Sequence, residues 1–295
     1  MLRMIRKKLL NPVLVKLDEI SAKLDDVGRN VNTAGTIEVV EEKSILSIED
    51  RYITAAPSVQ NQIDIFQGDW ISEFPIEGIL SGNAAHFTAD DRVSRCNGVV
   101  PVAGKKILEL GPFEAFHSYQ LEELGAGSVT SIESNKISFL KCLIVKNVFK
   151  LKTEYLHGDF REYLKSCEEK FDIVLASGVL YNMTDPIQLI RDIAGVTDTV
   201  FIWTFYYTKE RTDIQYMFEN TEPILLHSKY KVHKRIYEGR DAKTFSGGEK
   251  PYSMWPERET VLEALNDAGF DKINICVDHS LDAGGNHLLL VAEKS

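Results

Sequence analysis

Short apolar runs alternate with helical patterns through the middle and the end of the chain. Runs rich in apolar residues begin at Ile107, Val129, Phe171 and Thr199, and they predict buried strands. Residues 257–268 form a helical pattern closed by Gly269, and residues 272–277 and 287–292 predict a final hairpin. Strands that alternate with helices in this way predict an α/β domain.

The first strand runs into a turn with the features of a nucleoside site. Gly111 ends the strand where the backbone comes close to a ligand, and a helix is predicted from about residue 115 to residue 124. Glu133 ends the second predicted strand, 22 residues after Gly111. A carboxylate at this spacing can accept hydrogen bonds from both ribose hydroxyls of a bound nucleoside. Ser134 follows it at the same edge.

The residues of the turn disfavour a dinucleotide. Pro112 has no amide proton, Phe113 hinders close approach, and Glu114 repels a diphosphate. S-adenosylmethionine has no phosphate and carries a sulfonium and an ammonium, so Glu109 and Glu114 are expected to be favourable neighbours. NAD binding remains the weaker alternative.

Two further strands end in residues suited to the same cofactor. Residues 155–160 predict a third strand that ends at Asp159, which is placed to accept a hydrogen bond from an adenine amino group, while Phe160 covers the ring. The fourth strand runs into a loop at Ser177 and Gly178. Ligands bind at the carboxyl ends of strands in open α/β sheets, so these residues are expected at the cofactor.

Four segments together resemble the motifs of class I S-adenosylmethionine-dependent methyltransferases. They are Glu109-Leu-Gly111, Glu133, Gly158-Asp159 and Ser177-Gly-Val-Leu-Tyr181, and the resemblance is strong over about residues 104–204. It implies a Rossmann-like fold with a seven-stranded, mostly parallel sheet that ends in an antiparallel hairpin. The Gly-Val-Leu-Tyr segment followed by Asp-Pro is similar to a subgroup that includes the tRNA wobble-uridine carboxymethyltransferases.

The chain departs from this subgroup at two positions. Asn182 and Phe205 stand where relatives commonly have histidine. Both departures remove a titratable imidazole from the expected substrate side. The acid/base residues of the subgroup therefore cannot simply be carried over.

Composition and net charge limit the classes of binding partner that the protein is expected to have. The chain has 295 residues, of which 44% are hydrophobic, and a formal net charge of −10 at pH 7. A protein that binds nucleic acid normally presents a basic face, so nucleic acid is a disfavoured partner, although a local basic patch leaves it open. The four cysteines are scattered without metal-ligand spacing, which predicts reduced thiols in the cytoplasm and no metal site.

The chain is predicted to have three parts. Residues 1–45 form a helical arm and linker, residues 46–103 a lid or substrate wall, and residues 104–295 the methyltransferase domain, with a substrate-cover insertion at 205–256. No apolar run is long enough to span a membrane, and no secretory signal is evident, so a cytoplasmic protein is expected. Residues 1–10 combine basic and apolar positions, which is typical of peripheral contact with an inner membrane surface. The alternative is that the arm packs on the domain or on a second subunit of a homo-oligomer.

Catalysis requires an acceptor held in line with the methyl group, and an alcohol acceptor also benefits from a general base. His117, in the first turn of its helix, is the first candidate base. Tyr181 is the second candidate and is expected to orient the acceptor, and His86 in the predicted lid is the third. The sequence predicts O-methylation of a small metabolite, a glycan or a lipid-linked precursor. Wobble-uridine modification with a carboxylated cofactor and an inactive binding module are the alternatives.

Overall fold

The computed structural model describes residues 52–237, 248–279 and 285–295. Residues 56–295 form one compact unit. The predicted arm and linker at residues 1–45, with their proposed contacts to a membrane or a second subunit, lie outside the described residues. No helix in the described part of the chain is long and apolar enough to cross a membrane.

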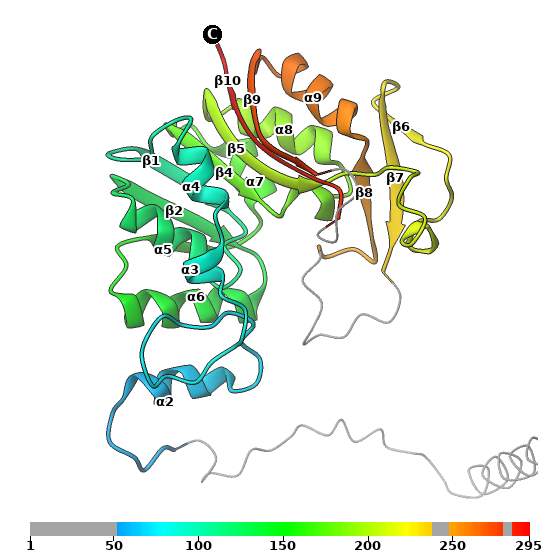
Figure 1. Cartoon of the computed structure of the whole chain (residues 1–295). Coiled ribbons are helices and arrows are strands. Elements are labelled where there is room, and N and C mark those ends of the chain that lie inside the picture. Colours follow the sequence, from blue (N-terminus) through cyan, green and yellow to red (C-terminus); the bar gives the residue numbers. More distant parts are fainter. Residues whose placement is uncertain (1–51, 238–247, 280–284) are drawn as a thin grey trace, which may run out of the picture. The chain divides into compact units, whose positions relative to one another are not determined.

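A seven-stranded sheet forms the centre of this unit (Figure 1), with strand order β3-β2-β1-β4-β5-β10-β9. Strands β1 to β5 pair in parallel, and β10 runs antiparallel to both β5 and β9. The strands are β1 (Lys106–Leu110), β2 (Ser128–Glu133), β3 (Glu154–His157), β4 (Ile173–Ser177), β5 (Thr199–Phe205), β9 (Lys272–His279) and β10 (His287–Glu293). The predicted mostly parallel sheet with its antiparallel end is confirmed.

Helices cover both faces of the sheet. They are α5 (Phe116–Glu123), α6 (Lys136–Phe149), α7 (Phe160–Ser166), α8 (Pro186–Ala194) and α9 (Arg258–Asp267), preceded by α2 (Val59–Ile63), α3 (His86–Ala89) and α4 (Arg92–Asn97). Successive strand residues point to opposite faces. Val174 packs in the core under α7, α8 and α9, whereas Ile173 and Leu175 pack in the core under α4 and α5. This double burial explains why the strands are continuous apolar runs.

Aromatic residues hold the segment before β1 against the domain. Trp70, Phe74 and Phe87 are buried in one cluster with Phe116 of α5 and residues of α6. The indole nitrogen of Trp70 also donates a hydrogen bond to the carbonyl of Ile63, 2.8 Å away. The segment is thus anchored beside the carboxyl end of β1.

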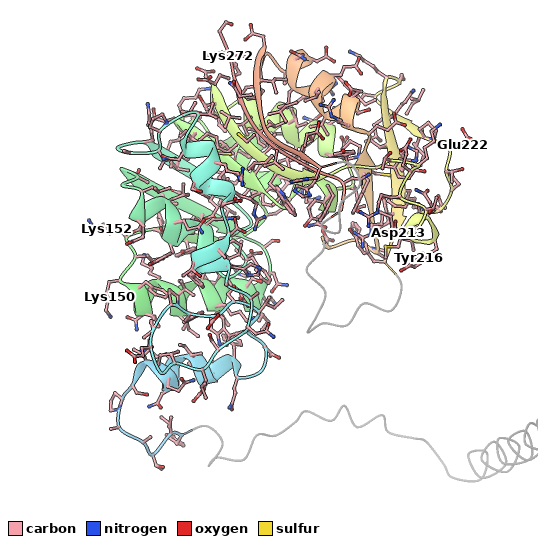
Figure 2. The ribbon with its side chains drawn as sticks, viewed as in Figure 1. Lys150, Lys152, Asp213, Tyr216, Glu222 and Lys272 are labelled. Carbon is pink, nitrogen blue, oxygen red and sulfur yellow. The ribbon has the colours of Figure 1, made fainter. Side chains whose placement is uncertain are left out.

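A second, smaller sheet follows β5. Its antiparallel strands are β6 (Ile224–Leu226), β7 (Tyr230–Ile236) and β8 (Tyr252–Pro256). The sequence predicted a substrate-cover insertion at residues 205–256 and assigned no strands within it. The apolar alternation at Tyr230 and Val232, both buried, is the signal that predicts β7. Charged side chains such as Lys150, Lys152 and Lys272 extend from the outer surface of the unit (Figure 2).

Candidate active site

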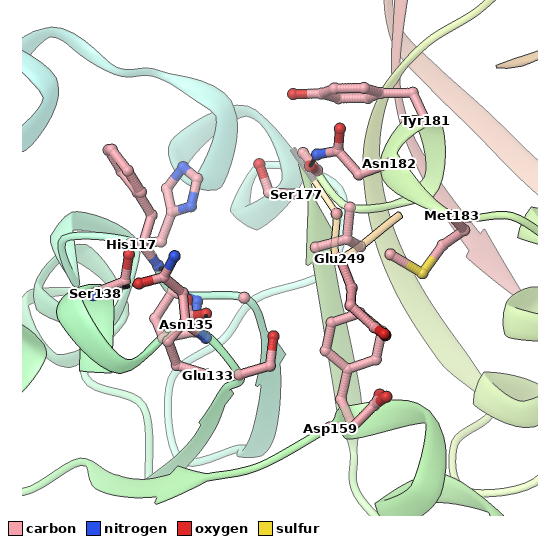
Figure 3. A pocket seen from close by; sticks show the side chains of 18 of the residues that line it. His117, Glu133, Asn135, Ser138, Asp159, Ser177, Tyr181, Asn182, Met183 and Glu249 are labelled. Carbon is pink, nitrogen blue, oxygen red and sulfur yellow. Dashed lines mark hydrogen bonds between the residues drawn. The ribbon is translucent and has the colours of Figure 1, made fainter. Parts of the chain in front are cut away.

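A cavity of about 920 Å³ lies along the carboxyl ends of the parallel strands. The strand order reverses between β1 and β4, and in open α/β sheets ligands bind at such a reversal. His117 and Glu133 approach the cavity from one side, and Tyr181, Asn182 and Met183 approach it from the other (Figure 3). The predicted site residues that line it are Gly111, Pro112, Phe113, Glu133, Ser134, Asp159, Phe160, Ser177, Gly178, His86, His117 and Tyr181.

The turn after β1 has an unusual backbone. Gly111 has a φ of +67°, and a Cβ at this position would lie 2.9 Å from Cγ1 of Val179. Phe113 and Ala115 also have positive φ values, of 57° and 62°. Residues other than glycine adopt positive φ values only at a cost in conformational energy. Backbone strain of this kind is concentrated at ligand-binding sites.

Glu133 is held by this turn and by the start of α6. Its carboxylate accepts hydrogen bonds from the amide of Phe113, at 3.2 Å, and from the amide of Asn135, at 2.8 Å. Burial raises the pKa of Glu133, and these backbone hydrogen bonds act against that rise. Each oxygen retains a lone pair for a further donor. The amide of Phe113 is already directed at this carboxylate, which matches a nucleoside and not a diphosphate.

The carboxylates of Glu109 and Glu114 do not lie where the sequence predicted them. Neither is among the described residues that line the cavity, because each carboxylate has partners within the protein. Glu109 is buried and accepts hydrogen bonds from the hydroxyls of Ser118 and Ser131. Burial raises its pKa to about 7, although these two hydrogen bonds lower it. The prediction that Glu109 contacts the cofactor is therefore corrected.

Glu114 points to the segment before β1. Its carboxylate lies 2.8 Å from Nζ of Lys141 and accepts hydrogen bonds from the amides of Ile71 and Ser72. Both charged side chains are buried, with exposed fractions of 0% for Glu114 and 7% for Lys141. Glu114 therefore holds a cavity wall in place, and the prediction that it is a neighbour of the sulfonium is wrong.

Asp159 also differs in local structure. The third strand ends at His157, and Asp159 is the N-cap of α7. Its carboxylate accepts a hydrogen bond from the amide of Arg161 at 2.8 Å and also pairs with the guanidinium of that residue. The strand cannot continue to Asp159 because the capping conformation starts a helix there. Phe160, the first residue of α7, is buried and lines the cavity.

His117 lies in the first turn of α5, as predicted, and is only 4% exposed. Its Nε2 atom is 3.5 Å from Oδ1 of Asp90. Burial lowers the pKa of His117 to about 4, and the charge of Arg92 adds to this effect, while Asp90 opposes it. The imidazole is consequently neutral at pH 7, as a general base must be.

The other two candidates also reach the cavity. Nδ1 of His86 is 3.0 Å from the hydroxyl of Ser72, and its ring stacks on Phe116 with a centroid distance of 4.8 Å. Burial raises the pKa of Tyr181, so its phenol stays protonated and can donate a hydrogen bond. Its ring packs edge-on against Trp203 and Trp255.

Several cavity residues were not assigned a role from the sequence. Gly248, Glu249 and Lys250 come from the end of the insertion, and a Cβ on Gly248 would lie 2.5 Å from the carbonyl oxygen of Asn182. A larger residue at position 248 would therefore displace this edge. Other lining residues without an assigned role include Ile71, Arg92, Asn135, Ser138 and His157. Asn182, which the sequence placed on the substrate side, lines the cavity too. For Asn135 a local signal existed, because an asparagine before an apolar run is typical of an N-cap.

Arg92 is the most strongly held of these residues. Its guanidinium donates to both carboxylate oxygens of Asp90 and, through Nη1, to the hydroxyl of Ser177 at 3.0 Å. It lies over the ring of Trp203, with Cζ 4.6 Å from the ring centroid. Burial acts to raise the pKa of Asp90, but His117 and Arg92 outweigh this effect and hold that pKa well below its ordinary value.

Among the residues that the structure describes, no group of three or more His, Cys, Asp or Glu side chains is arranged to hold a metal ion. The carboxylates that line the cavity are paired with backbone amides, with Arg161 or with Lys250.

Comparison with known proteins gives sequence similarity over part of the chain. The tRNA U34 carboxymethyltransferase of Nautilia profundicola is 25% identical over 95 residues, which are 32% of this chain and 31% of that protein. The enzyme of the same name from Campylobacter hominis is 28% identical over 107 residues, 35% of this chain and 37% of that protein. The chain thus spans about a third of the length of the curated relatives it matches. The predicted resemblance is confirmed.

No protein-family model matches the chain. Among solved structures, the N-terminal domain of EvdMO1, determined in the presence of SAH and D-fucose, has a TM-score of 0.64 and 20% identity. The match covers 80% of this chain and 96% of that domain. Together with the strand order and the antiparallel end of the sheet, this likeness shows that the chain has the Rossmann-like class I methyltransferase fold.

Proposed function

We propose that this protein is an S-adenosylmethionine-dependent methyltransferase that methylates a hydroxyl group of a small metabolite, a glycan or a lipid-linked precursor. One observation carries the proposal. A single cavity joins a buried carboxylate suited to a ribose, Glu133, to a buried neutral imidazole, His117. The two requirements of O-methylation, a nucleoside cofactor and a base, are met at opposite ends of one space.

The residues at the cofactor end fit S-adenosylmethionine. Glu133 has free lone pairs for the ribose hydroxyls, and Asp159 and Phe160 border the space beyond it, where an adenine would lie. Gly111 lets the turn approach the ligand without a side chain. When bound there, S-adenosylmethionine would supply an electrophilic methyl group for the acceptor oxygen, with the neutral thioether as leaving group.

The residues at the other end prepare the acceptor. Neutral His117 takes the hydroxyl proton as the new carbon–oxygen bond forms, and Asp90 beside Nε2 favours the resulting imidazolium. Tyr181 donates a hydrogen bond that orients the acceptor. A volume of about 920 Å³ is at the upper end of the range for small-molecule sites, which leaves room for an acceptor beside the cofactor.

The test is turnover of methyl-labelled S-adenosylmethionine by the full chain with fractionated cell extract. We expect label in a small-molecule, glycan or lipid fraction, and the incorporation should resist RNase. D-fucose and related sugars provide a defined panel, since D-fucose was present with the EvdMO1 domain. Cofactor binding without label transfer to any fraction would contradict the proposal and favour an inactive binding module.

One observation favours a second function, wobble-uridine modification. The two curated relatives reported above are both named tRNA U34 carboxymethyltransferases. A carboxylated cofactor requires a cation near the transferred group. Arg92, which is paired with Asp90, is a cation at this end of the cavity. Label that disappears on RNase treatment, together with a preference for the carboxylated cofactor, would establish this function and exclude the first.

A further inference from the structure

An arginine–aspartate pair stands at the cavity beyond the carboxyl end of β4. Nε of Arg92 lies 2.9 Å from each carboxylate oxygen of Asp90, and Nη2 pairs with the same carboxylate. The two side chains are only 19% and 9% exposed. Nη1 donates to Ser177, the last residue of β4. The guanidinium is therefore fixed before any ligand binds.

Two aromatic rings also pack against this guanidinium. Cζ of Arg92 is 4.6 Å from the ring centroid of Trp203 and 5.6 Å from that of Phe116. A guanidinium has five N–H donors, and these protein contacts occupy those of Nε and one each of Nη1 and Nη2. Two donors are left, on a side chain that lines the cavity. Such a fork matches a carboxylate.

The sheet order gives the direction in which a bound cofactor must extend. If its adenine lies at Asp159, after β3, and its ribose at Glu133, at the end of β2, the remaining part crosses the end of β1. The next strand in that direction is β4, which ends at Ser177. The amino-acid portion of the cofactor therefore reaches the place where Arg92 is held.

We propose that Arg92 binds the α-carboxylate of the cofactor's methionine portion, an assignment that rests on the proposed function. The residue belongs to the segment before the sheet and not to the class I motifs. The segment before β1, which borders the acceptor side of the cavity, thus also contacts the cofactor.

The charge of the pair favours this ligand over an anionic acceptor. Asp90 brings a carboxylate against the guanidinium, so the pair has no net charge. A phosphate dianion placed on Arg92 is repelled by Asp90, whereas the methionine portion carries an ammonium next to its carboxylate and is neutral overall. A neutral ion pair therefore fits a zwitterion better than a dianion.

The experiment compares two ligands that differ by one carboxylate. They are S-adenosylhomocysteine and its decarboxylated analogue, 5′-deoxy-5′-(3-aminopropylthio)adenosine, and calorimetry gives the Kd of each for the full chain. In Arg92→Met, we expect the Kd of S-adenosylhomocysteine to rise by about 10- to 100-fold, the scale of a lost charged hydrogen bond. The Kd of the decarboxylated analogue should stay unchanged.

Arg95→Met is the matched control. Arg95 lies on the same helix and pairs with Asp91, but these side chains are 49% and 56% exposed and do not line the cavity. This variant should bind both ligands as the wild type does. Arg92→Lys should recover part of the affinity for S-adenosylhomocysteine, since it keeps the charge and loses the fork.

The outcomes that contradict the inference differ from the outcome that contradicts the proposed function. Equal weakening of both ligands by Arg92→Met would show that the residue only maintains the shape of the site. Unchanged affinity for S-adenosylhomocysteine with lost turnover would assign Arg92 to the acceptor. Either outcome overturns the inference while the proposed function stands. If the wild type binds neither ligand, the proposed function itself fails.

Discussion

The two ends of the cavity are built in different ways. At the cofactor end, the residues lie at strand ends and in the short connections to the next helix: Glu133 ends β2, Asn135 caps α6, and Asp159 caps α7 after β3. At the acceptor end, His86 and Arg92 come from before β1, and Arg92 reaches across to Ser177 at the end of β4. One end depends on local chain geometry and the other on the docking of distant segments.

This difference determines how each end responds to substitution. A carboxylate such as Glu133 is positioned by backbone amides, that of Asn135 in its own strand–helix connection and that of Phe113 in the neighbouring one. A distant side chain such as Arg92 depends on every contact that holds its segment. We therefore expect the segment's anchor to have the largest effect, the base to follow, and the cofactor residues to have progressively smaller effects.

The anchor is tested by Glu114→Ala. The substitution leaves Lys141 buried without its partner and frees the amides of Ile71 and Ser72. Breaking a buried pair in this way should lower the free energy of unfolding by about 3 to 5 kcal/mol, measured by denaturant titration. Glu73→Ala, at an exposed position of the same segment, is the control and should change it little. Equal effects would show that Glu114 is no anchor.

The acceptor end is tested by His117→Gln. Loss of the general base should lower turnover by about 10²-fold or more, while calorimetric affinity for S-adenosylhomocysteine is preserved. His86→Gln, at the same wall, is the comparison and should be milder. A turnover loss that only follows weaker cofactor binding would reject His117 as the base.

The pH dependence has a definite sign. Because the pKa of His117 is about 4 in the folded protein, its imidazole is neutral above that value, and turnover should not fall on its account between pH 8 and pH 6. The ordinary value is 6.5, so its contribution to stability is fully present above pH 6.5 and is lost as pH falls toward 4. A rate that halves near pH 6.5 in the wild type, but not in His117→Gln, would contradict this pKa.

The cofactor end is tested first by Glu133→Ala. Removing the carboxylate deprives both ribose hydroxyls of an acceptor, at a cost of about 1.5 to 3 kcal/mol for charge-assisted hydrogen bonds. Affinity for S-adenosylhomocysteine should fall at least about tenfold by calorimetry. Glu154→Ala, at the exposed start of β3, is the control. Unchanged binding in a folded variant would remove Glu133 from the site.

Asp159→Asn should have the smallest effect. Asparagine still caps α7, so the helix should begin as before, and the side chain is already 32% exposed and paired with Arg161. Affinity for S-adenosylhomocysteine should fall by only a few-fold, about 1 kcal/mol or less, because the amide oxygen can still accept from an adenine amino group. A loss larger than that of Glu133→Ala would reverse the ranking of the two residues.

The sequence by itself determined the sheet and placed Glu133 and Asp159 at the edge where the cavity lies. Short continuous apolar runs bounded by turn residues are typical of strands buried on both faces, and parallel neighbouring strands bring the end of β2 to the same edge of the sheet as the Gly111 turn. Glu133 was therefore identified from spacing alone. Asp159 was placed at the cavity correctly, but its capping role was missed because a short strand and a helix start share the same few residues.

Only the tertiary structure decided the rest of the site. Glu109, Glu114 and Glu133 are three glutamates at or near the ends of β1 and β2, and they have different partners. Glu109 is bound in the core, Glu114 binds Lys141 and the segment before β1, and Glu133 lines the cavity. Asp90 pairs with Arg92 and also lies close to His117. These contacts join the segment before β1 to helix α5, which follows β1. Side-chain partners far apart in the chain are set by packing and charge in three dimensions, and no local pattern records them.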